Sequence, residues 1–272
     1  MSLDDLAGRG FDVEFHSHAR AILSVDFPEA LAELEQALAQ ATVPIEEIIA
    51  SGGGEAKGTQ RLRRALAGLG WLKRRFTVEK RINGEPRESQ SHEVDHVRLF
   101  DSGRAIALEI EWNNKDPFYD RDLENFKRLH ADGAISVGVI VTRGRSMHLG
   151  MRRLVRRFLD ERGIPSLEHL VAWGYEPTRR QRAEIAQRTG RPRDPLEFVD
   201  AFTDQFVSDK FGEATTHWRK LEQRVHRGVG NPCPLLLVGL PDSIVTFGEA
   251  GPADGAKAQA EAGLVQEVFD FG

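Results

Sequence analysis

Apolar residues recur along the chain at the spacing of a helix or of a strand. Leucines three or four positions apart predict helices over residues 28–40 and 58–69, and a glycine-rich turn lies between them at 51–54. Alternating apolar and polar positions then predict three consecutive strands, at 71–81, 92–100 and 104–112. Asn83-Gly84 is typical of a tight hairpin turn, so we expect the first two strands to pair antiparallel.

The segments that follow supply the rest of a sheet. A helix is expected over 120–130, followed by a buried strand at 134–142 and, much later in the chain, by another at 234–240. The order β-β-β-α-β describes a mixed central β-sheet flanked by helices. The sequence therefore predicts an α/β fold.

Residues 147–228 are expected to be largely helical, and they are rich in arginine. Within them, 195–208 has the pattern of an amphipathic helix. The tail from residue 249 combines glycine and alanine with acidic residues, and we expect it to be loosely held. We predict a single domain over 1–248 with a helical, Arg-rich insertion at about 147–210, followed by the tail 249–272.

The composition is that of a globular protein in water, with 40% hydrophobic and 29% charged residues among 272. No stretch approaches the ~20 apolar residues of a membrane span, and the N-terminus lacks the features of a secretory signal. Cys233 is the only cysteine, which suits a reducing compartment. Gly52–Gly54 lacks the Lys-Ser/Thr of a phosphate loop. We therefore expect a cytoplasmic protein with no membrane partner and no nucleotide cofactor.

The net charge of −5 conceals an uneven distribution. Residues 1–55 hold eleven acids and two bases, whereas 57–81 hold nine bases and a single acid, Glu79. Further arginine clusters lie within 143–157 and 179–193. Phosphate contacts act within a Debye length of ~10 Å, so local basic patches favour a nucleic-acid partner despite the acidic average. The alternative is that each patch is a solvated helix face.

Three acids fall on two adjacent predicted strands. Asp95 lies on 92–100, whereas Glu109 and Glu111 lie two residues apart on 104–112 and so share a face. Two carboxylates ~4 Å apart in a medium of effective dielectric ~20 repel each other by about 4 kcal/mol. A divalent cation cancels this repulsion, and Mg²⁺ suits such oxygen ligands. The alternative is that both glutamates lie on the wet face of an edge strand.

These acids predict metal-assisted hydrolysis of a phosphodiester. Asp95 and Glu109 would hold the metal, and Glu111 would orient or deprotonate the attacking water. His92 and His96 flank Asp95 in the sequence. We expect these histidines to support the site or to face a groove rather than to bind the ion.

An aspartate followed by Glu-x-Glu, on a hairpin that leads into a helix, resembles the core of the PD-(D/E)xK nucleases. Glu111 stands where most of these enzymes have lysine, as in the branch of type II restriction endonucleases that contains BamHI, BglII and BstYI. Further stretches resemble this branch: 57–60, 109–114, 140–144, and 214–217 with 237–240. The resemblance implies a restriction-endonuclease-like core in which 147–210 is an insertion.

The resemblance also implies a homodimer that uses Mg²⁺ to cut both strands of a short palindromic site in double-stranded DNA. The residues expected to contact DNA lie in the matching stretches: Asn113, Asn114, Lys115, Arg143, Thr215, Thr216 and His217. Asn114 is the first candidate for a base contact, because asparagine can form two hydrogen bonds with adenine. The asparagines and threonines are also suited to capping the helices that follow them.

Other interpretations stay open on the sequence alone. Repair and modification-dependent nucleases share this core, and a DNA-binding regulator could keep the sheet without cleaving. Glu55 or Glu93 could add a carboxylate to the site. His16-Ser17-His18 has the alternation of a metal site, but nothing nearby in the sequence supplies the third ligand that such a site needs.

Overall fold

The structure, a computed structural model, describes residues 3–51 and 55–248. They form two compact units. The first comprises the described parts of Met1–Ala41, Thr59–Leu149 and Glu213–Ile244, and the second those of Thr42–Gly58, Gly150–Gly212 and Val245–Gly272. Most of the predicted insertion 147–210 falls in the second unit, and the predicted tail 249–272 lies outside the described residues.

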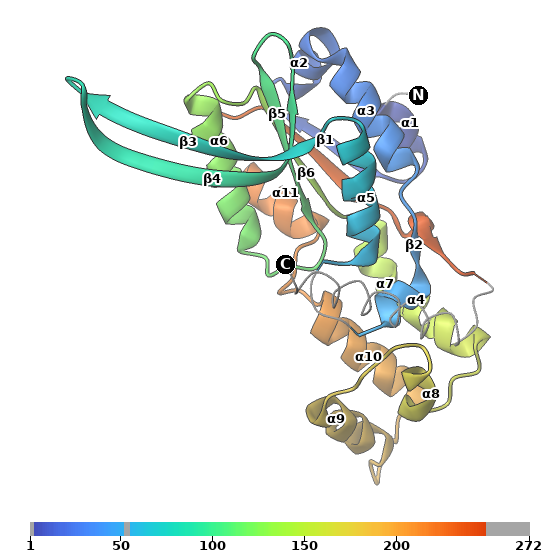
Figure 1. The fold of residues 1–272 in the computed structure, drawn as a ribbon. Coiled ribbons are helices and arrows are strands. Elements are labelled where there is room, and N and C mark those ends of the chain that lie inside the picture. The colour runs from blue at the N-terminus through green and yellow to red at the C-terminus, as the bar shows by residue number, and fades with distance from the viewer. Residues whose placement is uncertain (1–2, 52–54, 249–272) are drawn as a thin grey trace, which may run out of the picture. The chain divides into compact units, whose positions relative to one another are not determined.

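A six-stranded mixed sheet forms the centre of the first unit (Figure 1). Its strands, in spatial order, are β1 (Asp12–His16), β7 (Leu235–Leu240), β6 (Val137–Arg143), β5 (Ala105–Glu111), β4 (Glu85–Leu99) and β3 (Leu72–Ile82). β5, β6 and β7 are parallel, and the other neighbouring pairs are antiparallel. The predicted mixed sheet of an α/β fold is confirmed, and the sequence pattern had indicated each of these strands except β1.

The middle of the sheet is made of apolar runs. Every residue of β6 and β7 is buried, and in β5 only Ile110 is partly exposed. Strands covered on both faces are typical of the parallel part of an α/β sheet, and they need apolar side chains on both sides. Two buried side chains of β5 are nevertheless carboxyls, those of Glu109 and Glu111.

Strands β3 and β4 form a hairpin that extends beyond the rest of the sheet (Figure 1). Its turn residues, Asn83 and Gly84, both have positive φ angles, 52° and 86°, as a type I′ turn requires. β4 pairs with β5 only over His96–Leu99, so the preceding residues of β4 pair with β3 alone. Most side chains of this two-stranded arm are exposed.

Helices α6 (Phe118–Ala131) and α11 (Trp218–His226) pack on the sheet through one apolar cluster. Phe126 of α6 lies directly over Gly138 of β6, where a Cβ would overlap the phenylalanine ring. The remaining helices of this unit are α1 (Leu3–Gly8), α2 (Ala19–Asp26), α3 (Pro28–Ala39), most of α5 (Lys57–Gly68) and the 3-10 helix η1 (Asp242–Ile244). α3, α5 and α6 confirm the three helices predicted in this part of the chain.

The second unit is mainly helical. Its elements are β2 (Val43–Pro44), α4 (Ile45–Ile49), most of α7 (Arg145–Glu161), α8 (Leu167–Val171), α9 (Arg179–Thr189), α10 (Phe198–Phe211) and β8 (Val245–Thr246). The rings of Tyr175, Phe202 and Phe206 pack against one another in its core. The helical prediction for 147–228 is confirmed. No helix among the described residues is long and apolar enough to cross a membrane.

Candidate active site

The hairpin places Asp95 opposite Glu109. His96 pairs with Leu108 across β4 and β5, so the next position along the two antiparallel strands brings Asp95 and Glu109 together. The backbone N–H of Asp95 donates to Oε1 of Glu109 at 3.4 Å. β5 lies between β4 and β6, and Glu109 and Glu111 are only 6% and 3% exposed. The alternative of a wet face on an edge strand is therefore wrong.

A fourth acid, Asp122 of α6, meets the two glutamates. Its side chain is fully buried, and its Oδ1 accepts a hydrogen bond from Nε of Arg121 at 2.9 Å. Its Oδ2 is shielded from solvent and accepts no hydrogen bond from a donor group among the described residues. The charge of Asp122 acts on both Glu109 and Glu111. We call Glu109, Glu111 and Asp122 the buried acid group.

Sequence reasoning missed Asp122, although a signal for it was present. It lies three residues after Tyr119, directly before Leu123 and four residues before Phe126, which are all buried. This spacing places Asp122 on the inward face of the helix. An acid at such a position is uncommon unless a partner compensates its charge, which makes it a candidate for a site.

Burial and mutual repulsion favour the protonated forms of these carboxyls in the free chain. Burial, with repulsion from Asp122 and Asp95, raises the pKa of Glu109 to about 9. Burial also raises the pKa of Glu111 and that of Asp122, whose carboxyls lie within hydrogen-bond reach of each other. The guanidinium of Arg121 lies 2.8 Å from Asp122 and 3.9 Å from Glu111. One arginine cannot neutralise three carboxylates, so the group needs protons or a further cation.

Asp95 lies at the exposed rim of the buried acid group. Its carboxylate is 59% exposed and lies 3.5 Å from Nζ of Lys73, which also pairs with Glu93 at 2.6 Å. Among the described residues, Asp95, Glu109 and Glu111 do not form a group whose ligand atoms all lie within 4.8 Å of one another. The structure thus brings the three predicted acids to one place, with the Asp95 carboxylate turned towards lysine.

The carboxyl and the backbone of Glu111 are both held. Nδ2 of Asn114 donates to Oε2 of Glu111 at 2.7 Å. The hydroxyl of Thr142 donates to the backbone carbonyl of Glu111 at 2.7 Å, and it lies 2.5 Å from the hydroxyl of the buried Tyr119. These bonds fix the direction of Glu111 at the end of β5.

The histidines that flank Asp95 lie in different surroundings. His96 is buried, and its Nδ1 lies 3.3 Å from the backbone carbonyl of Leu108, so it supports the pairing of β4 with β5. His92 is partly buried, and burial lowers its pKa although the charge of Asp122 opposes this effect. His92 therefore lies beside the buried acid group, whereas His96 supports the strands.

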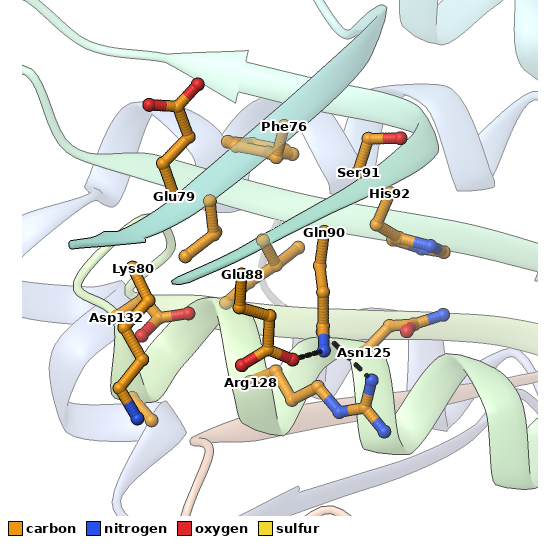
Figure 2. A pocket seen from close by; sticks show the side chains of 13 residues that line it. Phe76, Glu79, Lys80, Glu88, Gln90, Ser91, His92, Asn125, Arg128 and Asp132 are labelled. Atoms are coloured by element: carbon orange, nitrogen blue, oxygen red, sulfur yellow. Dashed lines mark hydrogen bonds between the residues drawn. The ribbon is translucent and has the colours of Figure 1, made fainter. Parts of the chain in front are cut away.

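A pocket of about 570 Å³ lies between the β3–β4 hairpin and α6 (Figure 2). His92 lines it together with Phe76 from the hairpin and Asn125 from the helix. Arg128 of α6 crosses to the hairpin and donates to Oε1 of Gln90 at 3.4 Å. The pocket thus has an apolar wall and several polar groups, and His92 links it to the buried acid group.

The segments predicted to contact DNA lie side by side. Residues 114–116 pair antiparallel with 214–216 through backbone hydrogen bonds of 2.8 and 3.1 Å. Their side chains differ in exposure: Asn114 and Lys115 are exposed, Asn113 and Thr215 are partly buried, and Thr216 and His217 are buried. The ring of His217 stacks on that of His148 at 3.8 Å, and burial lowers its pKa to about 4.

Arg143, at the end of β6, joins these segments. Its guanidinium donates to the backbone carbonyls of Trp112 and Thr216, both at 2.7 Å, and to the hydroxyl of Thr215 at 2.6 Å. Burial lowers the pKa of Arg143 to about 10, so it keeps its charge at neutral pH. In the free chain Arg143 is fully buried and acts as a clamp between loops.

A family model described as "Restriction endonuclease BglII/BglIII" matches residues 11–240. The match includes both strands of the hairpin, the buried acid group and the paired segments. The chain belongs to the BglII/BglIII restriction endonuclease family. No protein of curated function matches it significantly.

Membership of the BglII/BglIII family fixes the class of reaction. The protein is a type II, site-specific hydrolase that acts on phosphodiester bonds of double-stranded DNA. The resemblance found in the sequence is thereby confirmed. The acids of β5 lie within the matched residues, and so do the segments that pair beside them.

Restriction endonucleases of the BglII kind use a divalent metal, and the residues present fit one. The buried acid group and Asp95 offer carboxylate oxygens only, which are ligands of hard dications. Among the described residues, no nitrogen or hydroxyl group donates to Oδ2 of Asp122, and the neighbouring Glu111 carboxyl is a donor only while it is protonated. A cation would supply the positive charge that Arg121 alone cannot.

Proposed function

We propose that this member of the BglII/BglIII family depends on Mg²⁺ and cuts both strands of a short palindromic site as a homodimer. The buried acid group carries the proposal. Three carboxyls are enclosed beside a central strand, and a single arginine, Arg121, partly compensates their negative charge. Asp95 lies at the rim of this group. Buried charges are costly unless they are compensated, and a hard dication compensates oxygen ligands best.

Each acid has a separate role in the proposed reaction. Asp95 and Glu109 would hold the ion. Glu111 orients the attacking water and accepts its proton as the bond from phosphorus to the leaving sugar oxygen breaks. When bound, Mg²⁺ lowers the pKa of water and stabilises the charge that develops on the phosphate.

Asp122 and Asn114 position Glu111 in this proposal. Asn114 holds one carboxyl oxygen of Glu111 at 2.7 Å, and the carboxyl of Asp122 lies against the same side chain. Asp122 also adds negative charge beside Glu109, which strengthens the attraction for a cation. Asn114 and Asp122 thus orient the Glu111 carboxyl before DNA binds, and such preorganisation is a main source of the rate enhancement of enzymes.

The paired segments supply the proposed DNA surface. The exposed and partly exposed side chains keep their predicted role as contacts: Asn113, Asn114, Lys115 and Thr215. The buried side chains support these segments from beneath: Arg143, Thr216 and His217. A homodimer would present one such surface to each half of a palindrome, because a two-fold axis repeats every contact.

Cleavage of plasmid DNA tests the proposal. Wild-type protein with Mg²⁺ should yield discrete fragments, and a chelator should prevent their formation. Sequencing the fragment ends gives the recognition site, and light scattering should give twice the 30.4 kDa chain mass. Glu109→Ala protein, purified in the same way, controls for a contaminating nuclease. The proposed activity is refuted if the wild-type protein leaves the DNA of several different phage genomes intact, or if Glu109→Ala protein cuts as well as the wild type.

Methylated and unmethylated plasmids separate the proposed enzyme from a modification-dependent nuclease. A restriction enzyme of the proposed kind should cut the unmethylated plasmid. Cutting confined to methylated DNA would instead assign the protein to the modification-dependent class. Specific retention of DNA without any cutting would indicate a regulator.

Replacement of Mg²⁺ by Ca²⁺ tests the metal. Ca²⁺ takes more ligands at longer distances, so it should satisfy the carboxylates and support specific binding without aligning the attack. Gel shifts and cleavage assays on one duplex would measure both effects. Efficient cutting with Ca²⁺ alone would contradict a site of the Mg²⁺ type.

A further inference from the structure

The edge strand β1 and the end of α11 form a second group of potential metal ligands. Glu14 and His16 stand two positions apart on β1 and therefore share a face. His226, the last residue of α11, reaches them. The three ligand atoms lie within 4.8 Å of one another, and Oε1 of Glu14 is 2.9 Å from Nε2 of each histidine. None of these residues has a role in the proposed reaction.

Simple ion pairing accounts for only half of this arrangement. Nε2 of His226 makes a hydrogen bond with Glu14. Nε2 of His16 lies at the same distance from that oxygen, but the oxygen is off the direction in which the ring nitrogen would donate, so no hydrogen bond forms. This nitrogen is also shielded from solvent. An off-axis oxygen is expected when two ligands point at one ion rather than at each other.

The ring geometry supports convergence on one ion. Two imidazoles that bind an ion tetrahedrally through nitrogens at about 2.1 Å have ring centres roughly 5 Å apart. The rings of His16 and His226 are 5.8 Å apart at an interplanar angle of 60°. The described residues form one other such group, His148 with Glu213 and His217, but its rings stack at 3.8 Å and 4°. The in-plane lone pairs of stacked rings lie in parallel, separated planes and cannot converge on one ion.

We propose that Glu14, His16 and His226 bind a transition-metal dication such as Zn²⁺. Two imidazole nitrogens and one carboxylate oxygen are a donor set of zinc sites that keep a fourth position open. The exposure of His226, 56%, allows solvent to fill that position. Nitrogen ligands separate this site from the oxygen-only acid group, which suits Mg²⁺. The ion joins the edge of the sheet to α11 and so stabilises the first unit.

Metal titration of the full chain tests the site. Metal-free protein would be titrated with Co²⁺, whose visible absorption reports tetrahedral coordination, and with Zn²⁺ by equilibrium dialysis. We expect one tightly bound ion per chain. His16→Ala and His226→Ala should each weaken binding by at least about 100-fold, because loss of a merely supporting partner already costs about 10–100-fold.

His18→Ala is the matched control, because His18 is exposed and lies outside the group. It should bind Zn²⁺ as tightly as the wild type, and so should Glu109→Ala, which separates this site from the buried acid group. Zn²⁺ should raise the melting temperature of the wild type and of His18→Ala but not that of His226→Ala. Circular dichroism of His226→Ala checks that it folds. The assignment is wrong if the wild type binds no stoichiometric Co²⁺ or Zn²⁺, or if both His16→Ala and His226→Ala bind it unchanged.

Discussion

The two ligand groups of the first unit differ in their place in the sheet. The buried acid group lies at a central strand, where burial and repulsion raise the pKa of Glu109 to about 9. Glu14 lies on an edge strand, is 27% exposed and has two imidazoles for partners. The glutamate carboxyl thus occurs in two environments. One lacks enough positive charge to compensate it, and the other supplies imidazole nitrogens as neighbours.

We infer from this comparison that position in the sheet suits the two groups to different cations. A central strand removes water from its carboxyls, so they hold protons until a hard dication replaces them. An edge strand leaves room for a helix to bring in a histidine, and the mixed donors suit a softer ion. We expect substitutions in the buried acid group to change cleavage, and substitutions at the edge to change stability.

The largest effect is expected from the acids proposed to hold Mg²⁺. Asp95→Asn and Glu109→Ala should each lower the cleavage rate at least about 10³-fold, because a catalytic ion supplies several kcal/mol and each 1.36 kcal/mol is tenfold. Specific binding should persist, because recognition rests on groove contacts. Single-turnover cleavage and gel shifts on one duplex measure both quantities. Glu85→Gln, at an exposed position at the start of β4, is the control, and near-normal cutting by Glu109→Ala would end the assignment.

Glu111 should show the next largest effect. Glu111→Ala and Glu111→Lys should each lower the cleavage rate at least about 100-fold, as removal of an acid–base group typically does. The lysine would also repel the ion. Glu111→Gln keeps the shape and the contact with Asn114, so it should be the mildest of the three. Single-turnover rates would rank the variants. Wild-type cutting by Glu111→Ala would leave this residue without a catalytic role.

Asp122→Asn should give a smaller loss that falls on metal affinity. The variant removes one negative charge beside Glu109 and Glu111, and we expect about tenfold weaker Mg²⁺ binding, comparable to loss of a supporting partner. Isothermal titration in the absence of DNA measures this effect separately from cleavage. Asp132→Asn, an exposed acid at the end of the same helix, is the control. Equal affinities for both variants would show that Asp122 serves packing alone.

The smallest expected effect is on stability without metal. The pKa of Glu109 is about 9 in the folded chain against an ordinary value of 4.5, so the folded chain keeps a proton that the unfolded chain loses. Its stabilising contribution is full below pH ~4.5 and is lost as the pH rises through ~9. We expect the melting temperature in chelator to fall by on the order of ten degrees over this range. Glu109→Gln should flatten the decline, and an unchanged slope in that variant would contradict the assignment.

Much of the site follows from the sequence, because strand alternation is a local property. The pattern alone placed Glu109 and Glu111 on one face and Asp95 on the neighbouring strand. The central position of β5 in the sheet cannot be read from the sequence near it. The alternative that Glu109 and Glu111 lie on the solvent-exposed face of an edge strand therefore stayed open. The spacing of the buried residues in α6 places Asp122 on the inward face of the helix, but which acids it meets there depends on how the helix packs on the sheet.

Contacts between distant parts of the chain explain the remaining gaps. His16 and His226 meet because α11 ends beside β1. β1 is short and partly exposed, so its sequence pattern does not predict this contact. Arg143 was predicted as a DNA contact because it lies in a stretch, 140–144, that resembles the BamHI, BglII and BstYI branch. A sequence cannot reveal that three acceptor groups from two loops enclose its guanidinium.

The clamp formed by Arg143 connects recognition of a base sequence with the timing of the cut. Trp112, whose carbonyl it binds, directly follows Glu111, and Thr216 pairs with the backbone of Asn114, which holds the Glu111 carboxyl. Any base that displaces residues 214–216 must strain these bonds. A poorly matched DNA site should therefore be cut slowly even when it is bound, so that selectivity is expressed in the rate as well as in the affinity.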